Sequence, residues 1–224
     1  MTAPPTIIFD LDGTLADTIQ DLVGALNRSI AEYDLPPMDP REMAPLTGKG
    51  GLRAMIRLAF DRSETEYSAK DVKATFATTV QDYDAHVAVD TVLFSGARAA
   101  LELFRAKGWR QAVCTNKPIA QTTKLLQALE IDGYFDAVLG ADSGPAKKPD
   151  PAHILETIRQ AGGATERSVM VGDTITDIQA AKSAGIPVVA VDFGYSDVPV
   201  SVLEPNIVIS DYAALPAAAA ALIG

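Results

Sequence analysis

Two aspartates separated by one residue, Asp10 and Asp12, follow directly after the apolar residues 7–9. A short apolar run without polar alternation is typical of a strand covered on both faces, and ligands of such parallel sheets lie at the carboxyl ends of the strands. Because side chains alternate along an extended chain, we expect Asp10 and Asp12 to face the same side, and Gly13 to allow a sharp turn after them. Carboxylates in this arrangement are suited to nucleophilic attack, proton transfer or metal binding.

A second acidic pair, Asp173 and Asp177, follows another apolar run at residues 168–171 and begins a helical pattern. Residues four apart lie on one face of a helix, so both carboxylates are expected to point to one place. Four carboxylates at the end of one sheet repel each other unless a cation neutralises them, and a site of oxygen ligands favours Mg²⁺. The alternative is structural, because aspartates also cap helices and form turns.

Hydrogen-bond donors and positive charge come from two further segments. Thr115 and Asn116 follow the apolar residues 111–114 and precede Pro118, which suits the first turn of a helix. Their side chains, together with free backbone N–H groups at a helix start, suit phosphate oxygens. The loop at residues 147–151 adds Lys147 and Lys148. Each segment alone is ordinary, but their order along the chain indicates a phosphate site.

Strand and helix patterns alternate along most of the chain and predict how these residues are positioned. Apolar runs predict strands at residues 6–9, 111–114, 137–139, 168–171, 187–191 and 207–209. Helical patterns closed by glycine lie at 97–107, 119–130, 152–161 and 175–184, and the alanine-rich residues 217–221 predict a final helix. This alternation predicts an α/β fold, a doubly wound parallel sheet with a Rossmann-like core.

Residues 18–84 lack a strand signal and contain several helical patterns. We therefore predict an α/β core formed by residues 1–16 and 86–224, and an inserted α-helical domain formed by residues 17–85.

Composition restricts the partners and the location. The net charge of −10, from 19 basic and 29 acidic residues, argues against nucleic acid or an anionic membrane as partner. Apolar runs fall short of the ~20 residues of a membrane helix, and the N-terminus lacks the pattern of a signal peptide. We expect a cytoplasmic protein. Its single cysteine, Cys114, lies in a predicted strand and is expected to be a core thiol.

The chain resembles the haloacid dehalogenase-like hydrolase superfamily over essentially its whole length. The resemblance rests on four motifs in the order of the family: residues 10–14 (DLDGT), Thr115, Lys148 and residues 172–177 (GDTITD). Segments 115–118 (TNKP), 147–149 (KKP), 177–182 (DIQAAK) and 193–195 (FGY) resemble its phosphoglycolate phosphatase branch. The resemblance implies a Rossmann-like core with a helical cap inserted after the first motif.

The resemblance also implies a phosphatase with assigned catalytic roles. Asp10 attacks the phosphorus of a phosphate monoester, and Asp12 protonates the leaving alcohol. Mg²⁺ is held by Asp10, the backbone carbonyl of Asp12 and Asp173. Thr115 donates to a phosphoryl oxygen, as Asn116 is also expected to do.

Lys148 rather than Lys147 is expected to offset charge on the nucleophile and phosphate, because the family lysine directly precedes the proline. Asp177 is included in the metal set, although we expect it to hold Lys148 or a metal-bound water.

Substrate choice is expected to come from the cap, which closes over the leaving group. In the glycine-rich segment 47–51, Lys49 is a candidate partner for the carboxylate of 2-phosphoglycolate, and Arg53 is a candidate helper. The alternative for this segment is a flexible hinge with solvated charges. Small phosphorylated metabolites are the expected substrates, with 2-phosphoglycolate first. We expect the protein to be a monomer or a homodimer.

Other functions of the same superfamily use related residues. A sugar phosphomutase shares the Asp10–Asp12 pair, but its fourth motif tends to read Glu-Asp where this chain has Gly172-Asp173. A dehalogenase or phosphonatase departs from the family pattern at Asp12. A non-catalytic binding protein for phosphate ligands is expected to lose at least one of Asp10, Asp12, Lys148 or Asp173. All four are present.

Overall fold

Six strands form one parallel sheet in the computed structural model, which describes residues 3–63 and 66–223. Their order in the sheet is β5-β4-β1-β6-β7-β8, and every neighbouring pair is parallel. The bounds are β1 (Thr6–Phe9), β4 (Arg110–Cys114), β5 (Ala137–Leu139), β6 (Ser168–Gly172), β7 (Val188–Val191) and β8 (Ile207–Ile209). The six predicted strands are therefore confirmed to within one residue at each end.

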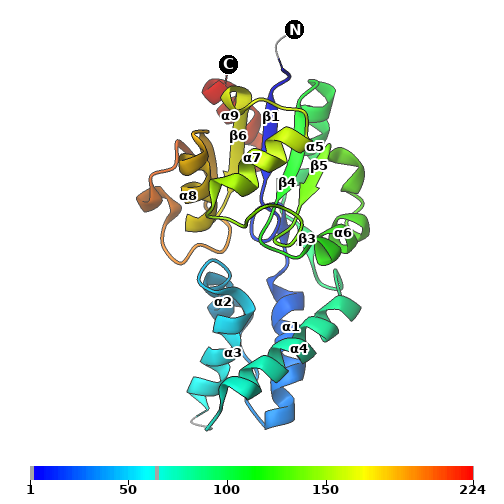
Figure 1. Cartoon of the computed structure of the whole chain (residues 1–224), viewed down its shortest axis with the longest axis vertical. Coiled ribbons are helices and arrows are strands. Elements are labelled where there is room, and N and C mark those ends of the chain that lie inside the picture. Colours follow the sequence, from blue (N-terminus) through cyan, green and yellow to red (C-terminus); the bar gives the residue numbers. More distant parts are fainter. Residues whose placement is uncertain (1–2, 64–65, 224) are drawn as a thin grey trace. The chain divides into compact units, whose positions relative to one another are not determined.

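Five helices flank the sheet: α5 (Ala97–Ala106), α6 (Ile119–Ala128), α7 (Pro151–Gln160), α8 (Ile175–Ala184) and α9 (Leu215–Ile223). Helices α7 and α8 pack together on one face, and α5 and α9 pack together on the other (Figure 1). The predicted α/β class, a doubly wound parallel sheet, is confirmed. Helix α9 extends beyond the expected residues 217–221 at both ends.

The central strands are buried on both faces, which explains their unbroken apolar sequence. Ile7, Ile8 and Phe9 of β1 have no exposed surface, and β6 and β7 on one side of β1 are buried along their whole length. Covered strands have no solvent side to select polar residues, so apolar runs rather than alternation identify them. The carboxyl ends of these strands then lie together at one edge of the sheet.

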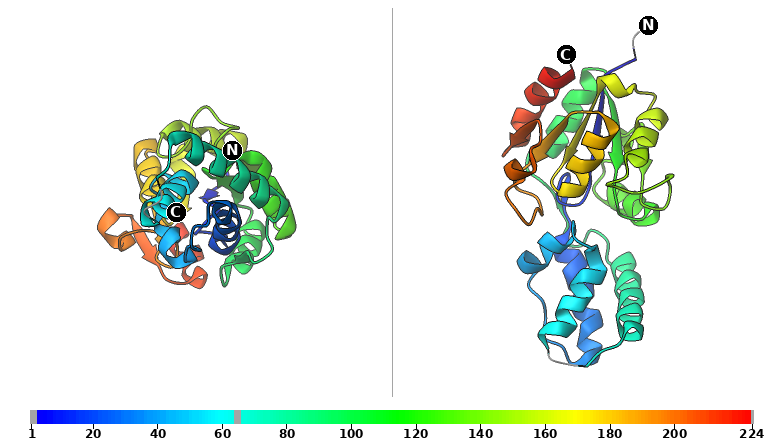
Figure 2. Two further views of the ribbon diagram at one scale, coloured as in Figure 1. Left: turned by 90° about the horizontal axis from the view of Figure 1, so that it is seen from below. Right: turned by 60° about the vertical axis from the view of Figure 1, so that its left-hand side comes forward.

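The chain divides into two compact units, one formed by residues up to Asp17 and from Val92 onward, the other by Thr18–Thr91. The second unit holds α1 (Ile19–Ile30), α2 (Pro40–Met43), α3 (Gly51–Arg62) and α4 (Ala69–Ala85). Within it, α1, α3 and α4 pack side by side (Figure 2). The boundaries predicted at 16/17 and 85/86, and a cap function for this unit, stay predictions.

Two short elements were missed by the sequence analysis. Strands β2 (Ala16–Asp17) and β3 (Val92–Leu93) form a separate antiparallel pair, and two residues are too few to show a pattern. Within residues 3–63 and 66–223, six 3₁₀ segments also occur, at Ala31–Tyr33, Ala44–Leu46, Asp132–Tyr134, Thr165–Arg167, Val200–Leu203 and Tyr212–Ala214. Among the described residues, we find no helix that combines the length and the apolar character of a membrane span.

The buried carboxylate of Asp21 fastens the start of α1 to the segment that leaves the second unit. It accepts hydrogen bonds from the backbone N–H groups of Asp90 and Thr91 at 2.9 Å each and from the Thr91 hydroxyl at 2.7 Å. A carboxylate that accepts several hydrogen bonds is well stabilised without a charged partner. The two ends of the second unit are thus held together within it.

Candidate active site

Asp10 follows β1, and its backbone is fixed to the neighbouring strand by a 2.9 Å hydrogen bond from Asp10 N to Val171 O. Its carboxylate is buried and lies 2.8 Å, through Oδ1, from Lys148 Nζ. Burial raises the pKa of Asp10 to about 6, with Lys148 opposing this increase and Asp177 adding to it. Near pH 7 the group is therefore mainly ionised, as a nucleophile must be.

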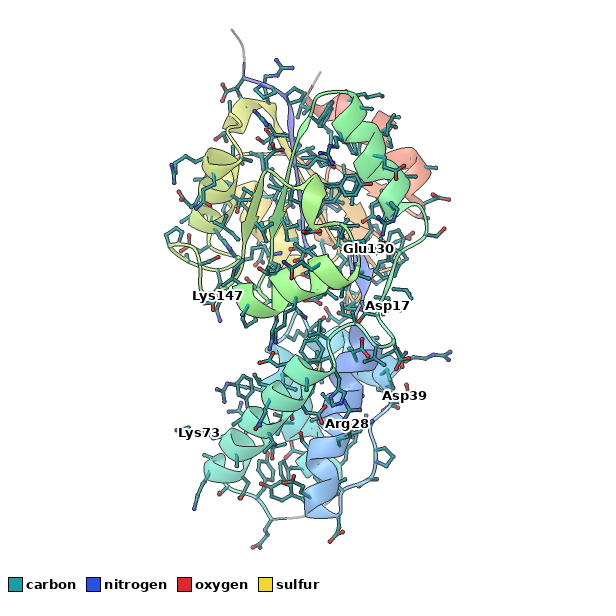
Figure 3. The ribbon with its side chains drawn as sticks, turned by 90° about the vertical axis from the view of Figure 1, so that its right-hand side faces the viewer. Asp17, Arg28, Asp39, Lys73, Glu130 and Lys147 are labelled. Atoms are coloured by element: carbon teal, nitrogen blue, oxygen red, sulfur yellow. The ribbon has the colours of Figure 1, made fainter. Side chains whose placement is uncertain are left out.

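Lys148 joins two buried carboxylates. Its Nζ atom lies 2.8 Å from Asp10 Oδ1 and 2.6 Å from Asp177 Oδ1. Burial alone would lower the pKa of Lys148, but Asp10 and Asp177 together outweigh that effect and raise it. The neighbouring Lys147 is exposed and extends from the loop surface (Figure 3). The structure therefore places Lys148, not Lys147, among the aspartates.

The carboxylate of Asp177 both contacts Lys148 and caps helix α8. Its Oδ1 accepts from Lys148, while its Oδ2 accepts from the backbone N–H of Thr174 at 3.0 Å and from the Thr174 hydroxyl at 2.7 Å. The second set forms a capping box at the start of α8. Helix capping thus fixes the carboxylate that holds Lys148.

Asp173 follows β6 and is fully buried. Its Oδ1 accepts from the Thr14 hydroxyl at 2.8 Å, and its Oδ2 accepts from the backbone N–H of Tyr195 at 2.7 Å. Burial, reinforced by the nearby Asp177 and Asp10, raises the pKa of Asp173 well above its usual range. Because the three carboxylates destabilise one another's charge, this cluster is a place where a cation is stabilised.

Three carboxylates gather into one set that fits a divalent cation. Asp10, Asp173 and Asp177 each offer a ligand oxygen, and these oxygens lie within 4.8 Å of one another. Lys148 supplies one positive charge against these three negative ones. Oxygen donors and an excess of negative charge suit Mg²⁺. A Cβ on Gly13, whose φ is +82°, would collide with Asp173 Oδ2, so glycine keeps the approach to this carboxylate open.

Asp12 lies beside this set, and its side chain is not part of it. Lys117 Nζ lies 3.0 Å from Asp12 Oδ1 and 3.3 Å from Oδ2. The sequence analysis assigned no role to Lys117, although it lies two residues beyond Thr115 on the loop after β4, the strand next to β1. Since the ends of adjacent parallel strands meet, that position was the available signal. A direct contribution of the Asp12 side chain to a metal stays a prediction.

Thr115 and Asn116 both lie on the loop after β4. Thr115 is buried, and its hydroxyl oxygen accepts a 3.2 Å hydrogen bond from the backbone N–H of Lys117. The amide of Asn116 donates to the carbonyl oxygen of Lys148 at 2.9 Å, which links this loop to the lysine loop. The hydrogen bond from Asn116 thus holds the backbone of Lys148 in place. Phosphate binding by Thr115 and Asn116 stays a prediction.

Lys49 and Arg53 belong to the second unit, and both are exposed. Lys49 precedes α3, whereas Arg53 lies in its first turn with its guanidinium 4.0 Å from the centre of the Phe76 ring. This cation–π contact gives Arg53 a local packing role. Binding of substrate by Lys49 and Arg53 stays a prediction.

Removing the Lys148 charge should destabilise the core unit strongly. In the metal-free protein, Lys148→Met leaves Asp10 and Asp177 buried without their cation, and we expect the free energy of unfolding to fall by about 3 kcal/mol. Urea unfolding measures this loss. Lys147→Met is the matched control and should change stability by less than about 0.5 kcal/mol. Equal effects of the two substitutions would contradict the assignment.

His153 and Cys114 are buried near Lys148 and have no part in the proposed chemistry. Burial raises the pKa of the Cys114 thiol to about 11, so the thiol stays protonated, in agreement with a core thiol. Burial, assisted by the charge of Lys148, lowers the pKa of His153 from 6.5 to about 4. His153 is therefore neutral in the folded protein at neutral pH.

The neutral state of His153 predicts a pH dependence of stability. Between about pH 6.5 and about pH 4 the unfolded chain binds a proton at this position and the folded chain does not, so His153 reduces stability as the pH falls. Asp10 acts in the opposite direction over part of this range, because its pKa is raised on folding. The test is therefore a comparison of urea unfolding at pH 7.5 and pH 5 for wild type and His153→Leu. The variant should lose less stability on acidification, and an unchanged loss would contradict the prediction.

A family model for haloacid dehalogenase-like hydrolases matches residues 7–191. The chain belongs to this family. It is 43% identical over 211 residues to a phosphoglycolate phosphatase of Agrobacterium fabrum, covering 94% of this chain and 90% of that protein. It is also 38% identical to a phosphoglycolate phosphatase of Caulobacter vibrioides, covering 97% and 92% of the two chains. These findings confirm the predicted enzyme class, a phosphoric monoester hydrolase.

Solved structures of this hydrolase family give the same result for the fold. The crystal structure of a predicted phosphoglycolate phosphatase from Haemophilus somnus is 29% identical and superposes with a TM-score of 0.90, covering 97% of this chain and 99% of that one. The resemblance inferred from the four motifs is thus confirmed over nearly the whole chain.

Proposed function

We propose that this hydrolase is a Mg²⁺-dependent phosphatase that converts 2-phosphoglycolate into glycolate and phosphate through an aspartyl-phosphate intermediate. The observation that carries the proposal is the buried set in which Asp10 and Asp177 share Lys148, with Asp173 alongside. Relatives that are 33–43% identical to this chain are named phosphoglycolate phosphatases, which supports this substrate. The cytoplasmic location, the monomeric or homodimeric state and the exclusion of nucleic acid and membrane partners stay predictions.

In the first step, a carboxylate oxygen of Asp10 attacks phosphorus, and the bond from phosphorus to the ester oxygen breaks. The leaving oxygen of glycolate takes a proton from the carboxyl group of Asp12, and the phosphoryl group is now an acyl phosphate on Asp10. Lys148 offsets the charge of Asp10 before attack and the charge of the phosphoryl oxygens afterwards. Thr115 donates its hydroxyl hydrogen to one of these oxygens.

In the second step, water replaces the aspartate. The ionised Asp12 takes a proton from the water molecule, whose oxygen attacks phosphorus while the bond between phosphorus and the Asp10 oxygen breaks. Phosphate leaves, Asp10 is an ionised carboxylate again, and Asp12 carries the proton for the next cycle. Asp12 thus acts as the acid in the first step and as the base in the second, whereas Asp10 carries the phosphoryl group between the two steps.

Mg²⁺ is proposed to be held by Asp10, Asp173 and the backbone carbonyl of Asp12. Asp177 is proposed to hold a water molecule bound to the ion. When bound, the ion screens the negative nucleophile from the negative phosphate and stabilises charge on the transferring group. Hydrogen bonds from Thr14 and Tyr195 fix the Asp173 carboxylate in advance, so little reorganisation is needed when the cation binds.

The proposal is tested by measuring phosphate release from a panel of esters in excess Mg²⁺. The panel includes 2-phosphoglycolate, ethyl phosphate, glucose 1-phosphate, glucose 6-phosphate, a nucleoside monophosphate and pyrophosphate. We expect kcat/KM for 2-phosphoglycolate to exceed that of every other compound by at least about tenfold. Preference for another ester overturns the substrate, and interconversion of the glucose phosphates without phosphate release overturns hydrolysis in favour of a phosphomutase.

A further inference from the structure

Lys117 extends from the loop after β4 to the carboxylate of Asp12. Its Nζ atom lies at 3.0 and 3.3 Å from the two oxygens of Asp12, and the exposed fractions of the two side chains are 7% and 23%. Nearly complete burial of an ammonium group is costly unless ion pairs or hydrogen bonds compensate for the lost hydration. Asp12 keeps more exposed surface than any of Asp10, Lys148 and Asp177, so the Lys117–Asp12 pair is the more accessible part of the site.

The position of Asp12 locates the leaving group. To protonate the ester oxygen, a carboxyl oxygen of Asp12 must come within about 3 Å of it. Lys117 Nζ lies 3.0 and 3.3 Å from the two Asp12 oxygens. An ester oxygen placed to accept a proton from Asp12 is therefore at most about 6 Å from Lys117 Nζ. In 2-phosphoglycolate, one methylene with bonds of about 1.5 Å separates the ester oxygen from the carboxylate carbon. A substrate oriented with its carboxylate toward Lys117 can therefore contact this ammonium.

An anionic leaving group needs a cation on this side of the site. Three buried carboxylates already give the site negative charge, and the chain as a whole carries −10. Lys148 is already shared between Asp10, the proposed nucleophile, and Asp177. Lys117, in contrast, lies beside the proton donor and so beside the group that leaves. Without such a cation, the approach of the substrate carboxylate to the negatively charged site is unfavourable.

We propose that Lys117 determines substrate specificity by binding the carboxylate of an anionic leaving group. This inference rests on the proposed function, because it takes Asp12 as the group that protonates the leaving oxygen. It assigns part of the selection among phosphate esters to the core unit, in addition to any contribution of Lys49 and Arg53. The preferred substrates are then phosphate esters of 2-hydroxy acids, whose carboxylate lies one carbon from the ester oxygen.

The test compares two esters that differ in the carboxylate, 2-phosphoglycolate and ethyl phosphate, in full-length Lys117→Met. Methionine keeps the length and apolar stem of lysine and removes its charge. We expect kcat/KM for 2-phosphoglycolate to fall at least about tenfold more than kcat/KM for ethyl phosphate, mainly through KM. Lys117→Arg should recover part of the preference. Lys147→Met, which removes an exposed charge from the adjoining lysine loop, should leave the ratio of the two substrates unchanged.

Three results overturn the inference. An equal fall for both esters shows that Lys117 only positions Asp12, and an unchanged ratio without any fall shows that it has neither role. Inhibition by glycolate that is equally strong in wild type and Lys117→Met also contradicts carboxylate binding. If Lys117→Met does not fold, as judged by circular dichroism, Lys117→Gln takes its place.

Failure of the proposed substrate gives a different signature. A wild-type enzyme that hydrolyses ethyl phosphate as well as 2-phosphoglycolate overturns that substrate. The same comparison is then made with 2-phospholactate and 2-phosphoglycerate. Preference for either ester that disappears in Lys117→Met supports the inference, and no preference for any carboxylate ester overturns it.

Discussion

Replacing Asp10 with asparagine should reduce turnover of 2-phosphoglycolate by at least about 10⁴-fold. An amide is a poor nucleophile toward phosphorus, and the substitution also removes one of the two carboxylates that hold Lys148. The measurement is phosphate release at saturating substrate and Mg²⁺. In parallel, rapid acid quenching should detect phosphate bound to the wild-type protein and none bound to Asp10→Asn.

The control for Asp10→Asn is Asp132→Asn, which makes the same chemical change at an exposed position. Its rate should stay within about twofold of wild type, because surface substitutions away from special features have small effects. Turnover by Asp10→Asn at a rate near wild type would rule out Asp10 as nucleophile, provided that mass spectrometry shows the asparagine intact.

Removal of divalent cations should reduce activity by at least about 10³-fold, and added Mg²⁺ should restore it. The physical reason is the excess of buried carboxylate charge over the single charge of Lys148. The same excess predicts an effect that does not depend on catalysis. Mg²⁺ should raise the melting temperature of the EDTA-treated protein, because a ligand that binds only the folded state stabilises it.

Asp173→Asn separates specific metal binding from a general salt effect. The variant should lose most of the increase in melting temperature with Mg²⁺, whereas Asp132→Asn should keep it, and NaCl of equal ionic strength should not reproduce the increase. Full activity in EDTA after dialysis would contradict a divalent cofactor. An unchanged Mg²⁺ effect in Asp173→Asn would place the cation elsewhere.

The role of Lys148 could be predicted from the sequence, whereas the contact of Lys117 could not. Lys148 is identified by its position before Pro149 in the family motif, and the structure places it between Asp10 and Asp177. Lys117 lies in a segment that resembles the phosphoglycolate phosphatase branch, yet its contact with Asp12 depends on a lysine side chain reaching across from a neighbouring strand. Rotamers of long side chains are chosen by the surrounding packing, which local sequence does not specify.

The sequence alone determined the parallel sheet, its six strands and the helices that flank it, because covered strands leave apolar runs and glycines mark helix ends. It predicted that four carboxylates meet, since parallel strands bring their carboxyl ends to one edge, and three of them, Asp10, Asp173 and Asp177, do so. The side chain of the fourth, Asp12, pairs with Lys117 instead. Only the tertiary structure paired Lys117 with Asp12, and it revealed the β2–β3 pair. Those contacts join residues far apart in the chain, and their energies depend on distance and burial, which are set only when the whole core has packed.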